Sequence, residues 1–220
     1  SCIYETDDDN RPNEYWLPRE LKVKKAKKVA AKEGWVNIYK YFSKEHIWPR
    51  GLPLDQIKKE RFLLEDVEES VDCPIQQGLV NNSPDVDAIW RLTLDRAFNF
   101  DKQAKDSLLI PKGVWSPFNT QSTWWWPIAY PLLYIPSYCS FRMCDIWKSF
   151  IAQRCLWELD YELVFHPPEV IQERNPHNLN RDFEEEIPGY LLNAKIAKIL
   201  DKLIVEPASR NILTRNRSGT

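Results

Sequence analysis

A short apolar stretch that ends in three consecutive carboxylates most constrains how this chain can fold. Residues 2–5 have the composition of a buried strand, and Asp7, Asp8, Asp9 and Asn10 follow them directly. In open α/β sheets, ligands bind outside the carboxyl ends of the strands, which is where this loop would lie. The pattern therefore favours an α/β sheet with a ligand site beside the acidic loop, residues 7–9.

The acidic loop is also a candidate cation site. Clustered carboxylates repel one another unless a cation or hydrogen-bond donors compensate their charge. Oxygen ligands suit Mg²⁺, Mn²⁺ or Ca²⁺, but an EF-hand is excluded because Pro12 would occupy the position of its invariant glycine. The alternative interpretation, a solvated acidic turn, stays open from these residues alone.

Composition excludes several other function classes. Glycine accounts for only 6 of the 220 residues, and neither a P-loop nor a G-x-G-x-x-G motif occurs. The five cysteines include no C-x-x-C pair, so neither a zinc knuckle nor a complete disulfide framework is indicated. A formal net charge of −2 gives no global basic field, and we expect no nucleic-acid partner.

The longest uncharged run, residues 113–141, is long enough to cross a bilayer. Four prolines interrupt it, and proline breaks a helix interior because it lacks the N–H donor. We therefore expect no transmembrane helix in this run.

Hydrophobic periodicity predicts two long helices. Residues 145–159 are apolar on most of the helical circumference, which is typical of a mostly buried helix. Residues 190–203 predict an amphipathic helix. Its expected buried positions are Leu192, Ile196, Ile199, Leu200 and Leu203. The basic segment 19–32 predicts a third helix or an ordered loop at the surface.

Runs of β-branched and aromatic residues between turn signals predict the strands. The predicted strands are residues 35–42, 61–66, 87–94 and 161–165. The last of these is expected to stop at Pro167 and Pro168, because proline cannot donate to a strand ladder.

The stretch IYETDDDN, residues 3–10, resembles the metal-binding DxD motif of STELLO-type glycosyltransferases, and the similarity continues in order to about residue 190. Further blocks that resemble this family are WVNIY (35–39) with WPRGLPL (48–54), QQGL (76–79) with PDVDAIWRL (84–92), PFNTQ (117–121), and DIW (145–147) with AQR (152–154) and LWE (156–158). Each block alone is weak, but five groups of blocks in preserved order are specific.

The resemblance implies a GT-A-like α/β fold, with a mixed sheet flanked by helices, a divalent cation (Mn²⁺ or Mg²⁺) and a nucleotide-sugar donor. The acceptor, a glycan or another molecule, stays unknown. It further implies a lumenal Golgi protein, in contact with a membrane only through an anchor upstream of this chain. Residues 1–205 would be the C-terminal part of one glycosyltransferase domain that lacks here its nucleoside-binding half, and residues 206–220 a flexible polar tail.

Two alternatives to a transferase stay open. One is a non-catalytic scaffold that keeps the GT-A fold to organise other Golgi enzymes. The other is a metal-dependent phosphohydrolase that uses the same acidic loop.

The resemblance also assigns roles to single residues. Asp9 would be the direct metal ligand, and Asp7 would share the metal or contact the ribose. GT-A sites often draw a histidine from near their C-terminal end, and His177 is preferred to His166, which has an alternative interpretation as a satisfied core residue. The donor is further expected to contact Asp8, Asn119, Gln121 and Arg174.

Asp145 and Asp87 are the candidate catalytic carboxylates. Asp145 is either the N-cap of its helix or a carboxylate that faces the acceptor. Ser149 and Gln153 continue a polar stripe down this helix, and a sugar could supply the partners that they need. Asp87 is either a general base or half of a structural ion pair with Arg91.

An aromatic cluster is the last candidate for a sugar site. Flat aromatic faces beside the amide side chains at positions 119 and 121 can bind a sugar by stacking and hydrogen bonding. The alternative is that these rings fill the core. The cluster consists of Trp115, Trp124, Trp125, Trp126 and Tyr130.

Overall fold

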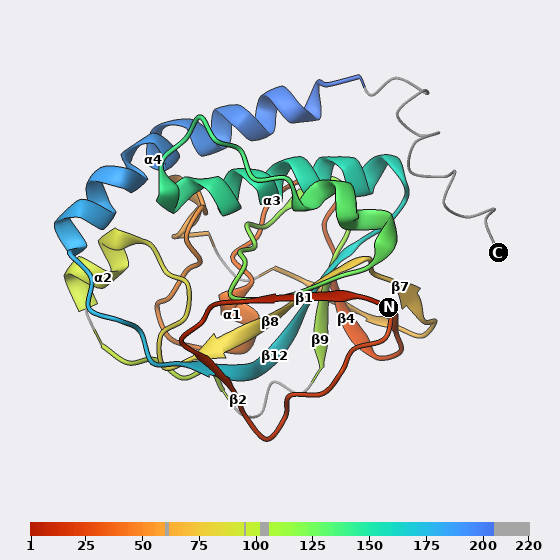
Figure 1. Cartoon of the computed structure of the whole chain (residues 1–220). Coiled ribbons are helices and arrows are strands. Elements are labelled where there is room, and N and C mark those ends of the chain that lie inside the picture. Colours follow the sequence, from red (N-terminus) through yellow and green to blue (C-terminus); the bar gives the residue numbers. More distant parts are fainter. Residues whose placement is uncertain (60–61, 95, 102–105, 205–220) are drawn as a thin grey trace.

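Eight strands of the described chain form one mixed sheet, and helices pack against it (Figure 1). This computed structural model describes residues 1–59, 62–94, 96–101 and 106–204, so the tail expected at 206–220 lies outside the described residues. Across the sheet the order is β1 (Ile3–Thr6), β11 (Ser122–Trp125), β8 (Ile75–Asn81), β12 (Leu163–Gln172), β9 (Ser107–Ile110), β4 (Ala26–Val29) and β6 (Leu64–Val67), while β2 (Asn10–Pro12) pairs with β12. The predicted mixed α/β sheet flanked by helices is confirmed.

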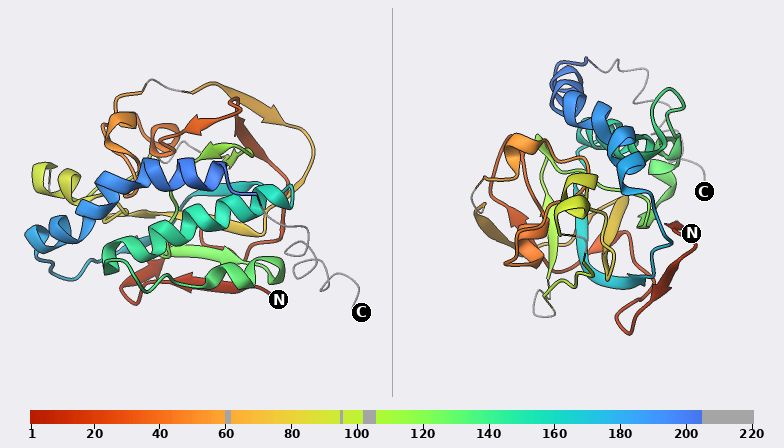
Figure 2. Two further views of the ribbon diagram at one scale, coloured as in Figure 1. Left: turned by 90° about the horizontal axis from the view of Figure 1, so that it is seen from above. Right: turned by 90° about the vertical axis from the view of Figure 1, so that its left-hand side faces the viewer.

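Short strand pairs and helices complete the described fold. The pairs are β5 (Gly34–Trp35) with β10 (Val114–Trp115), and β3 (Lys22–Val23) with β7 (Val71–Asp72). The helices are α1 (Tyr39–Phe42), α2 (Ala88–Leu94), α3 (Phe141–Glu158) and α4 (Leu179–Asp201), with 3₁₀ turns at Leu54–Gln56 and Pro127–Leu133. The long helices α3 and α4 lie side by side over the sheet, as two further views show (Figure 2).

The directions of the strands bring several loops to one edge of the sheet. β1 and β8 both pair antiparallel with β11, so they run the same way, and β12 pairs parallel with β8. The carboxyl ends of β1, β8 and β12 therefore point to one edge. The acidic loop, the loop 82–87 and the segment 173–178 all begin there.

The two prolines do not end β12, contrary to the prediction. The strand continues to Gln172, with irregular register against β8 around Pro168. On its other side, β12 pairs with β9 only up to Phe165 and with β2 only from Val170. The prolines lie between these partners, so on that side no neighbour needs the N–H groups that they lack.

The strand predicted at residues 87–94 is wrong, because the segment forms helix α2. Asp87 precedes this helix, and its Oδ1 accepts a hydrogen bond from the Trp90 backbone N–H at 2.8 Å. That geometry is an N-cap, which supplies an acceptor to a helix N–H that has no partner within the helix. The fully buried Trp90 side chain then anchors the helix in the core.

The N-terminal third also differs from the prediction. Only Trp35 of the strand expected at 35–42 lies in a strand, because the Asn37 side chain accepts from the Tyr39 N–H at 3.2 Å and the chain turns into α1. The segment 19–32 contains β3 and β4 in place of a helix. The strand predicted at 61–66 is confirmed as β6, shifted by a few residues.

Helix α3 confirms the buried helix predicted at 145–159, although it begins earlier, at Phe141. Ser140 occupies the N-cap position. Asp145 therefore lies inside the helix, and its interpretation as an N-cap is wrong.

Helix α4 confirms the predicted helix but is longer, and only part of the predicted face is buried, since Ile196 and Leu200 pack partly buried against the core while the other three expected positions are exposed. Leu192, Ile199 and Leu203 are 37%, 66% and 49% exposed. The residues of the helix that are buried are Asp182, Glu186, Gly189, Asn193 and Ala197. The reason is electrostatic, because Glu186 and Asp182 pair with arginines that lie beneath the helix.

The aromatic cluster mostly fills the core. Trp115, Trp124 and Trp125 are 2%, 5% and 0% exposed, so the core interpretation is correct for these three rings. Trp126 and Tyr130 are half-buried. Within the described residues, every helix is too short or too polar to span a bilayer.

Candidate functional site

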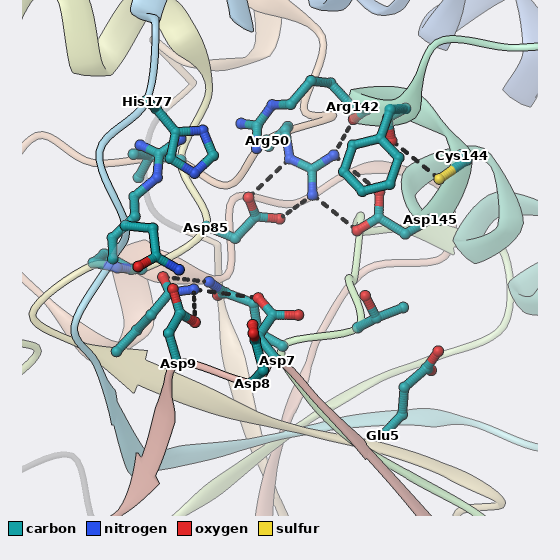
Figure 3. Close-up of a pocket in the computed structure, with 18 of the residues that line it drawn as sticks. Glu5, Asp7, Asp8, Asp9, Arg50, Asp85, Arg142, Cys144, Asp145 and His177 are labelled. Atoms are coloured by element: carbon teal, nitrogen blue, oxygen red, sulfur yellow. Dashed lines mark hydrogen bonds and ion pairs between the residues drawn. The ribbon is translucent and has the colours of Figure 1, made fainter.

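A pocket of about 440 Å³ lies at the edge where β1, β8 and β12 end, and the N-terminal part of α3 closes one side (Figure 3). Most of the predicted site residues line it. They are Asp7, Asp8, Asp9, Gln121, Asp145, Arg174 and His177. Asp87 and Asn119 lie outside the lining. The expectation of a site beside the acidic loop thus corresponds to a real cavity.

Asp7 and Asp9 are held beside each other by a single side chain. The Nε2 group of Gln172, at the end of β12, donates to Asp7 Oδ2 at 3.2 Å and to Asp9 Oδ1 at 2.9 Å. The Oε1 atom of Gln172 in turn accepts from Gln121 Nε2 at 2.8 Å. Two carboxylates and two amides from three strand ends therefore form one connected network.

The negative charge around Asp7 is incompletely compensated. Burial, together with the nearby carboxylates of Asp85, Asp9 and Asp145, raises the pKa of the Asp7 carboxyl to about 6, while Arg50 acts in the opposite direction. A raised carboxyl pKa means that the site favours an added positive charge, either a proton or a cation.

The donor set fits a hard divalent cation only in part. Mg²⁺ and similar ions are commonly held by one or two carboxylates, with substrate phosphates and waters completing the shell. Asp7 and Asp9 can supply that pair. No cluster of three or more His, Cys, Asp or Glu side chains that could hold a metal occurs in the part of the chain that the structure describes.

His177 lies across the pocket from the acidic loop (Figure 3). Its Nδ1 atom is 3.3 Å from Asp182 Oδ2, so the ring is directed toward helix α4. His166 is a core residue, as its alternative interpretation held, because it is 3% exposed and bonded through both ring nitrogens to Ser107 and Gln76.

Arg50 is the main residue of the pocket that the sequence did not single out. Its guanidinium pairs with both oxygens of Asp85 and both oxygens of Asp145, at 2.8–2.9 Å, and also donates to the Arg142 carbonyl. Burial alone would raise the pKa of Asp85, but Arg50 holds it below its ordinary value. The Arg50 guanidinium therefore links three parts of the fold: the loop after residue 48, the loop after β8 and helix α3.

The pairing with Arg50 also determines what Asp145 can do. Asp145 lines the pocket, yet its two oxygens are engaged by the guanidinium. Because both oxygens already accept hydrogen bonds from Arg50, neither is free to accept the proton of an acceptor hydroxyl. The geometry therefore makes Asp145 a positioning residue.

Asp87 has structural partners in place of the predicted ones. Its Oδ2 accepts from Trp48 Nε1 at 2.7 Å, and Arg91 donates to the Pro84 carbonyl instead of to Asp87. Burial raises the pKa of Asp87 to about 6, against the effect of the hydrogen bonds from Trp48 and Trp90. The predicted Asp87–Arg91 ion pair is wrong, and the side chain serves as a cap.

The two predicted amide residues have different roles, since Asn119 supports the site and Gln121 lines it. Asn119 is 5% exposed and accepts from Gln77 Nε2 and from the Gln121 N–H, so it positions Gln121 from behind. Gln121 lines the pocket, and its buried Oε1 atom has no hydrogen-bond partner among the described residues. An unpartnered buried acceptor beside a cavity is suited to a ligand hydroxyl.

The polar stripe on α3 is satisfied by the protein. Ser149 Oγ donates to the Ile146 carbonyl at 2.7 Å, and Gln153 Oε1 accepts from the Ser116 N–H at 3.1 Å. The hypothesis that a sugar supplies these partners is wrong.

Arginines line the wall opposite the acidic loop. Arg142 donates through Nε and Nη2 to Glu186 at 3.0 and 2.7 Å, and Arg174 pairs with Asp182 at 2.8 Å. Arg91 lies in the same wall. Arg142 and Arg91 were not predicted to be site residues, and no local pattern marks either of them, since only the fold brings α2 and α3 together.

Comparison with known proteins gives two relatives from one plant. The chain is 32% identical over 143 residues to a protein named "Probable glycosyltransferase STELLO2" from Arabidopsis thaliana, which is 61% of this chain and 18% of that protein. It is 34% identical over 141 residues to "Probable glycosyltransferase STELLO1" of the same plant, which is 60% of this chain and 18% of that protein. The STELLO-type resemblance is confirmed. No protein-family model matches the chain.

The blocks that resemble STELLO-type sequences converge on the pocket. They lie far apart along the chain, yet each of five blocks contributes at least one lining residue. These include Asp9, Arg50, Asp85, Gln121 and Asp145. The matched segments cover 18% of the length of each of the two STELLO proteins.

Proposed function

We propose that this chain carries the donor site of a metal-dependent glycosyltransferase, which moves a sugar from a nucleotide diphosphate to an acceptor. One observation carries the proposal: Asp7 and Asp9 are fixed on the shared donor Gln172 at the carboxyl ends of parallel strands. The names of the two relatives support transfer of a sugar. The Golgi lumen is the compartment that we propose with it, on the family resemblance.

In this proposal Asp7 and Asp9 hold Mn²⁺ or Mg²⁺ together with the donor phosphates. A bound divalent ion supplies Lewis-acid stabilisation of the departing diphosphate. Gln172 holds the two carboxylates beside each other, and the free Oε1 of Gln121 accepts a hydrogen bond from a hydroxyl of the donor. Asp8, which is exposed beside them, adds negative charge that favours the cation.

The wall formed by Arg50, Asp85 and Asp145 gives the pocket a fixed shape. Bidentate pairs restrict the rotamers of the side chains that form them, so this wall keeps one shape. A sugar that packs against a wall of fixed shape is held in one orientation. This wall supplies orientation, whereas the acidic loop supplies affinity for the cation.

Calorimetric titration of UDP and GDP, with and without Mn²⁺, tests the proposal. Wild-type protein should bind one of these nucleotides in a Mn²⁺-dependent manner, and Asp9→Asn should lose that dependence because a principal anionic ligand is removed. Asp55→Asn is the matched control, since Asp55 is exposed and lies outside the lining. Metal-independent binding of equal strength in wild type and Asp9→Asn would falsify the metal role.

One observation favours the scaffold alternative. Asp145 is engaged by Arg50 and Asp87 is a helix cap, so neither of the predicted catalytic carboxylates is free to act as a base. Product analysis separates the candidates. Sugar on an acceptor indicates a transferase, Mn²⁺-dependent nucleotide binding without turnover indicates a scaffold, and released phosphate indicates a phosphohydrolase.

A further inference from the structure

A second pocket, of about 400 Å³, adjoins the first behind the arginine wall. The two pockets share Arg91, Arg174, Asn175 and His177 in their linings. The second pocket adds Arg96, so its described lining contains three arginines and no carboxylate. Its chemistry is therefore opposite to that of the acidic loop.

The carboxylates near this pocket compensate only part of its charge. Asp182 lies behind the lining and serves both Arg174, at 2.8 Å, and His177, at 3.3 Å. Glu45 pairs with Arg96, where both side chains are about half exposed and the pair is weak. One carboxylate is thus shared by the Arg174 guanidinium and the His177 ring.

Arg91 is the least compensated member of the set. It is only 7% exposed, and none of the ion pairs of the described residues includes it. Its Nη2 donates to the Pro84 carbonyl at 2.7 Å, but its buried Nε has no partner among the described residues. A buried guanidinium with an unused donor is costly unless an anion accepts from it or from its neighbours.

The guanidinium groups also repel one another. Burial, together with the charges of Arg174 and Arg142, lowers the pKa of Arg91 to about 10, while Asp85 acts in the opposite direction. Burial and Arg142 lower the pKa of Arg174 as well. An oxyanion in the second pocket would relieve this repulsion and accept charge-assisted hydrogen bonds.

We propose that the second pocket binds an oxyanion, a phosphate or carboxylate, carried by the acceptor of the transfer reaction. This rests on the proposed function, which places the donor phosphates with a cation at the acidic loop. The second pocket contains none of residues 5–9, and the shared arginine wall lies between it and that loop. An acceptor anchored there by its charge would extend its neutral end into the first pocket.

Titration with inorganic phosphate, followed by ³¹P NMR, tests whether the pocket binds anions. Wild type should bind phosphate, and both Arg174→Gln and Arg96→Gln should weaken binding, by about tenfold for the more buried Arg174. Arg181→Gln is the matched control, because Arg181 is 75% exposed on α4 and outside both linings. Arg91 is left unchanged, since a substitution at so buried a position would test folding instead.

Three outcomes overturn the anion pocket. In the first, wild type does not bind phosphate. In the second, wild type and all variants bind phosphate equally, which indicates an adventitious ion only. In the third, Arg181→Gln weakens phosphate binding as much as Arg174→Gln does. The melting temperature of each variant confirms that its folded fraction is being measured.

A second arm separates the acceptor from the donor as the source of the anion. Saturating Mn²⁺ and nucleotide should leave phosphate affinity within about twofold, and Asp9→Asn should bind phosphate as wild type does. Displacement of phosphate by the nucleotide overturns the acceptor assignment. Phosphate binding in a wild type that binds no nucleotide overturns the glycosyltransferase proposal and supports the anion pocket.

Methyl glucuronate and methyl glucoside, compared as probes, complete the test. The carboxylate sugar should bind more tightly than its neutral analogue in wild type, and Arg174→Gln should abolish the difference. Equal binding of the two sugars in wild type contradicts an acceptor with a carboxylate, and phosphate binding then supports a phosphorylated one.

Discussion

At the scale of single residues, the pocket depends on where charge is compensated and where it is not. Arg50 pairs with both Asp85 and Asp145, so the oxygens of these carboxylates have structural partners even though the residues line the cavity. Asp7 has only an amide donor, and burial raises its pKa to about 6. The uncompensated carboxylate is the one expected to receive a ligand.

The first prediction concerns the pH dependence of Asp7. Its pKa of about 6 in the folded protein exceeds the ordinary value of 3.8, so protons compete with a cation as the pH falls through 6. Mn²⁺-dependent nucleotide binding should therefore weaken between pH 7 and pH 5, and Asp7→Asn should bind weakly with a flatter profile. A wild-type affinity that is constant over this range contradicts the assignment.

The raised pKa of Asp7 also affects the stability of the ligand-free protein. The folded protein holds the Asp7 proton at pH values where the unfolded chain has released it. The free energy of unfolding should therefore fall as pH rises from about 4 to 6, and Asp7→Asn should reduce that slope. Asp87, whose pKa is also raised to about 6, contributes with the same sign and remains in the variant.

The second prediction concerns Arg50. Arg50→Ala leaves the buried Asp85 and the half-buried Asp145 without their partner, which should lower the free energy of unfolding by about 3–5 kcal/mol. Arg50→Lys keeps the charge but not the fork that pairs with both carboxylates, so an intermediate loss is expected. Urea denaturation measures both. If Arg50→Lys were as stable as the wild type, the bidentate geometry would not be important for stability.

At the scale of elements, tertiary contacts gave several segments a secondary structure that differs from the one their local sequence pattern predicts. Residues 87–94 resemble a strand, yet the cap from Asp87 and burial of Trp90 make them a helix. Prolines that normally end a strand are tolerated in β12, because its antiparallel partners change at that point. The helix of α3 was predictable, since its apolar residues cover most of the circumference and need no particular partner.

The third prediction separates a cap from a catalytic base at Asp87. Asp87→Ala removes the acceptor of the Trp90 N–H and of Trp48 Nε1, which should cost about 1–3 kcal/mol of stability. Asp87→Asn keeps one oxygen acceptor and should cost less. Thermal melts measure the stability, and nucleotide binding by the folded fraction should be unchanged in both variants. Unchanged stability with lost transfer activity would instead support a base.

At the scale of the whole molecule, the site lies where the sheet edge meets the layer of helices. The acidic loop was predictable because its carboxylates are consecutive in the sequence. The Arg50 network was not, because its partners are 35 and 95 positions away and only the topology brings them together. The polar part of the buried face of α4 was missed for a similar reason, since Asp182 and Glu186 pair with arginines outside this helix, whereas the contacts of Ile196 and Leu200 with the core were predicted.

Glu186 joins the helices around this site. It is 1% exposed, accepts from Arg142 of α3 at 2.7 and 3.0 Å, and accepts from the Ala88 N–H at the start of α2 at 2.7 Å. The Tyr190 hydroxyl donates to it at 2.7 Å. One carboxylate on α4 thus connects three helices.

The fourth prediction is that Glu186→Ala destabilises the whole molecule. The change leaves Arg142 and the Ala88 N–H without their acceptor, and breaking such a buried pair should cost about 3–5 kcal/mol. Glu186→Gln retains one oxygen acceptor and the side-chain volume, so it should lose less. Urea denaturation followed by tryptophan fluorescence and by circular dichroism should give coincident, shifted transitions, because α3 contributes both to the main apolar cluster of the sheet and to the cluster beside α4. A loss below about 1 kcal/mol, or a transition in which only the helices melt, would show that α4 is held to the sheet by its apolar contacts instead of by this carboxylate.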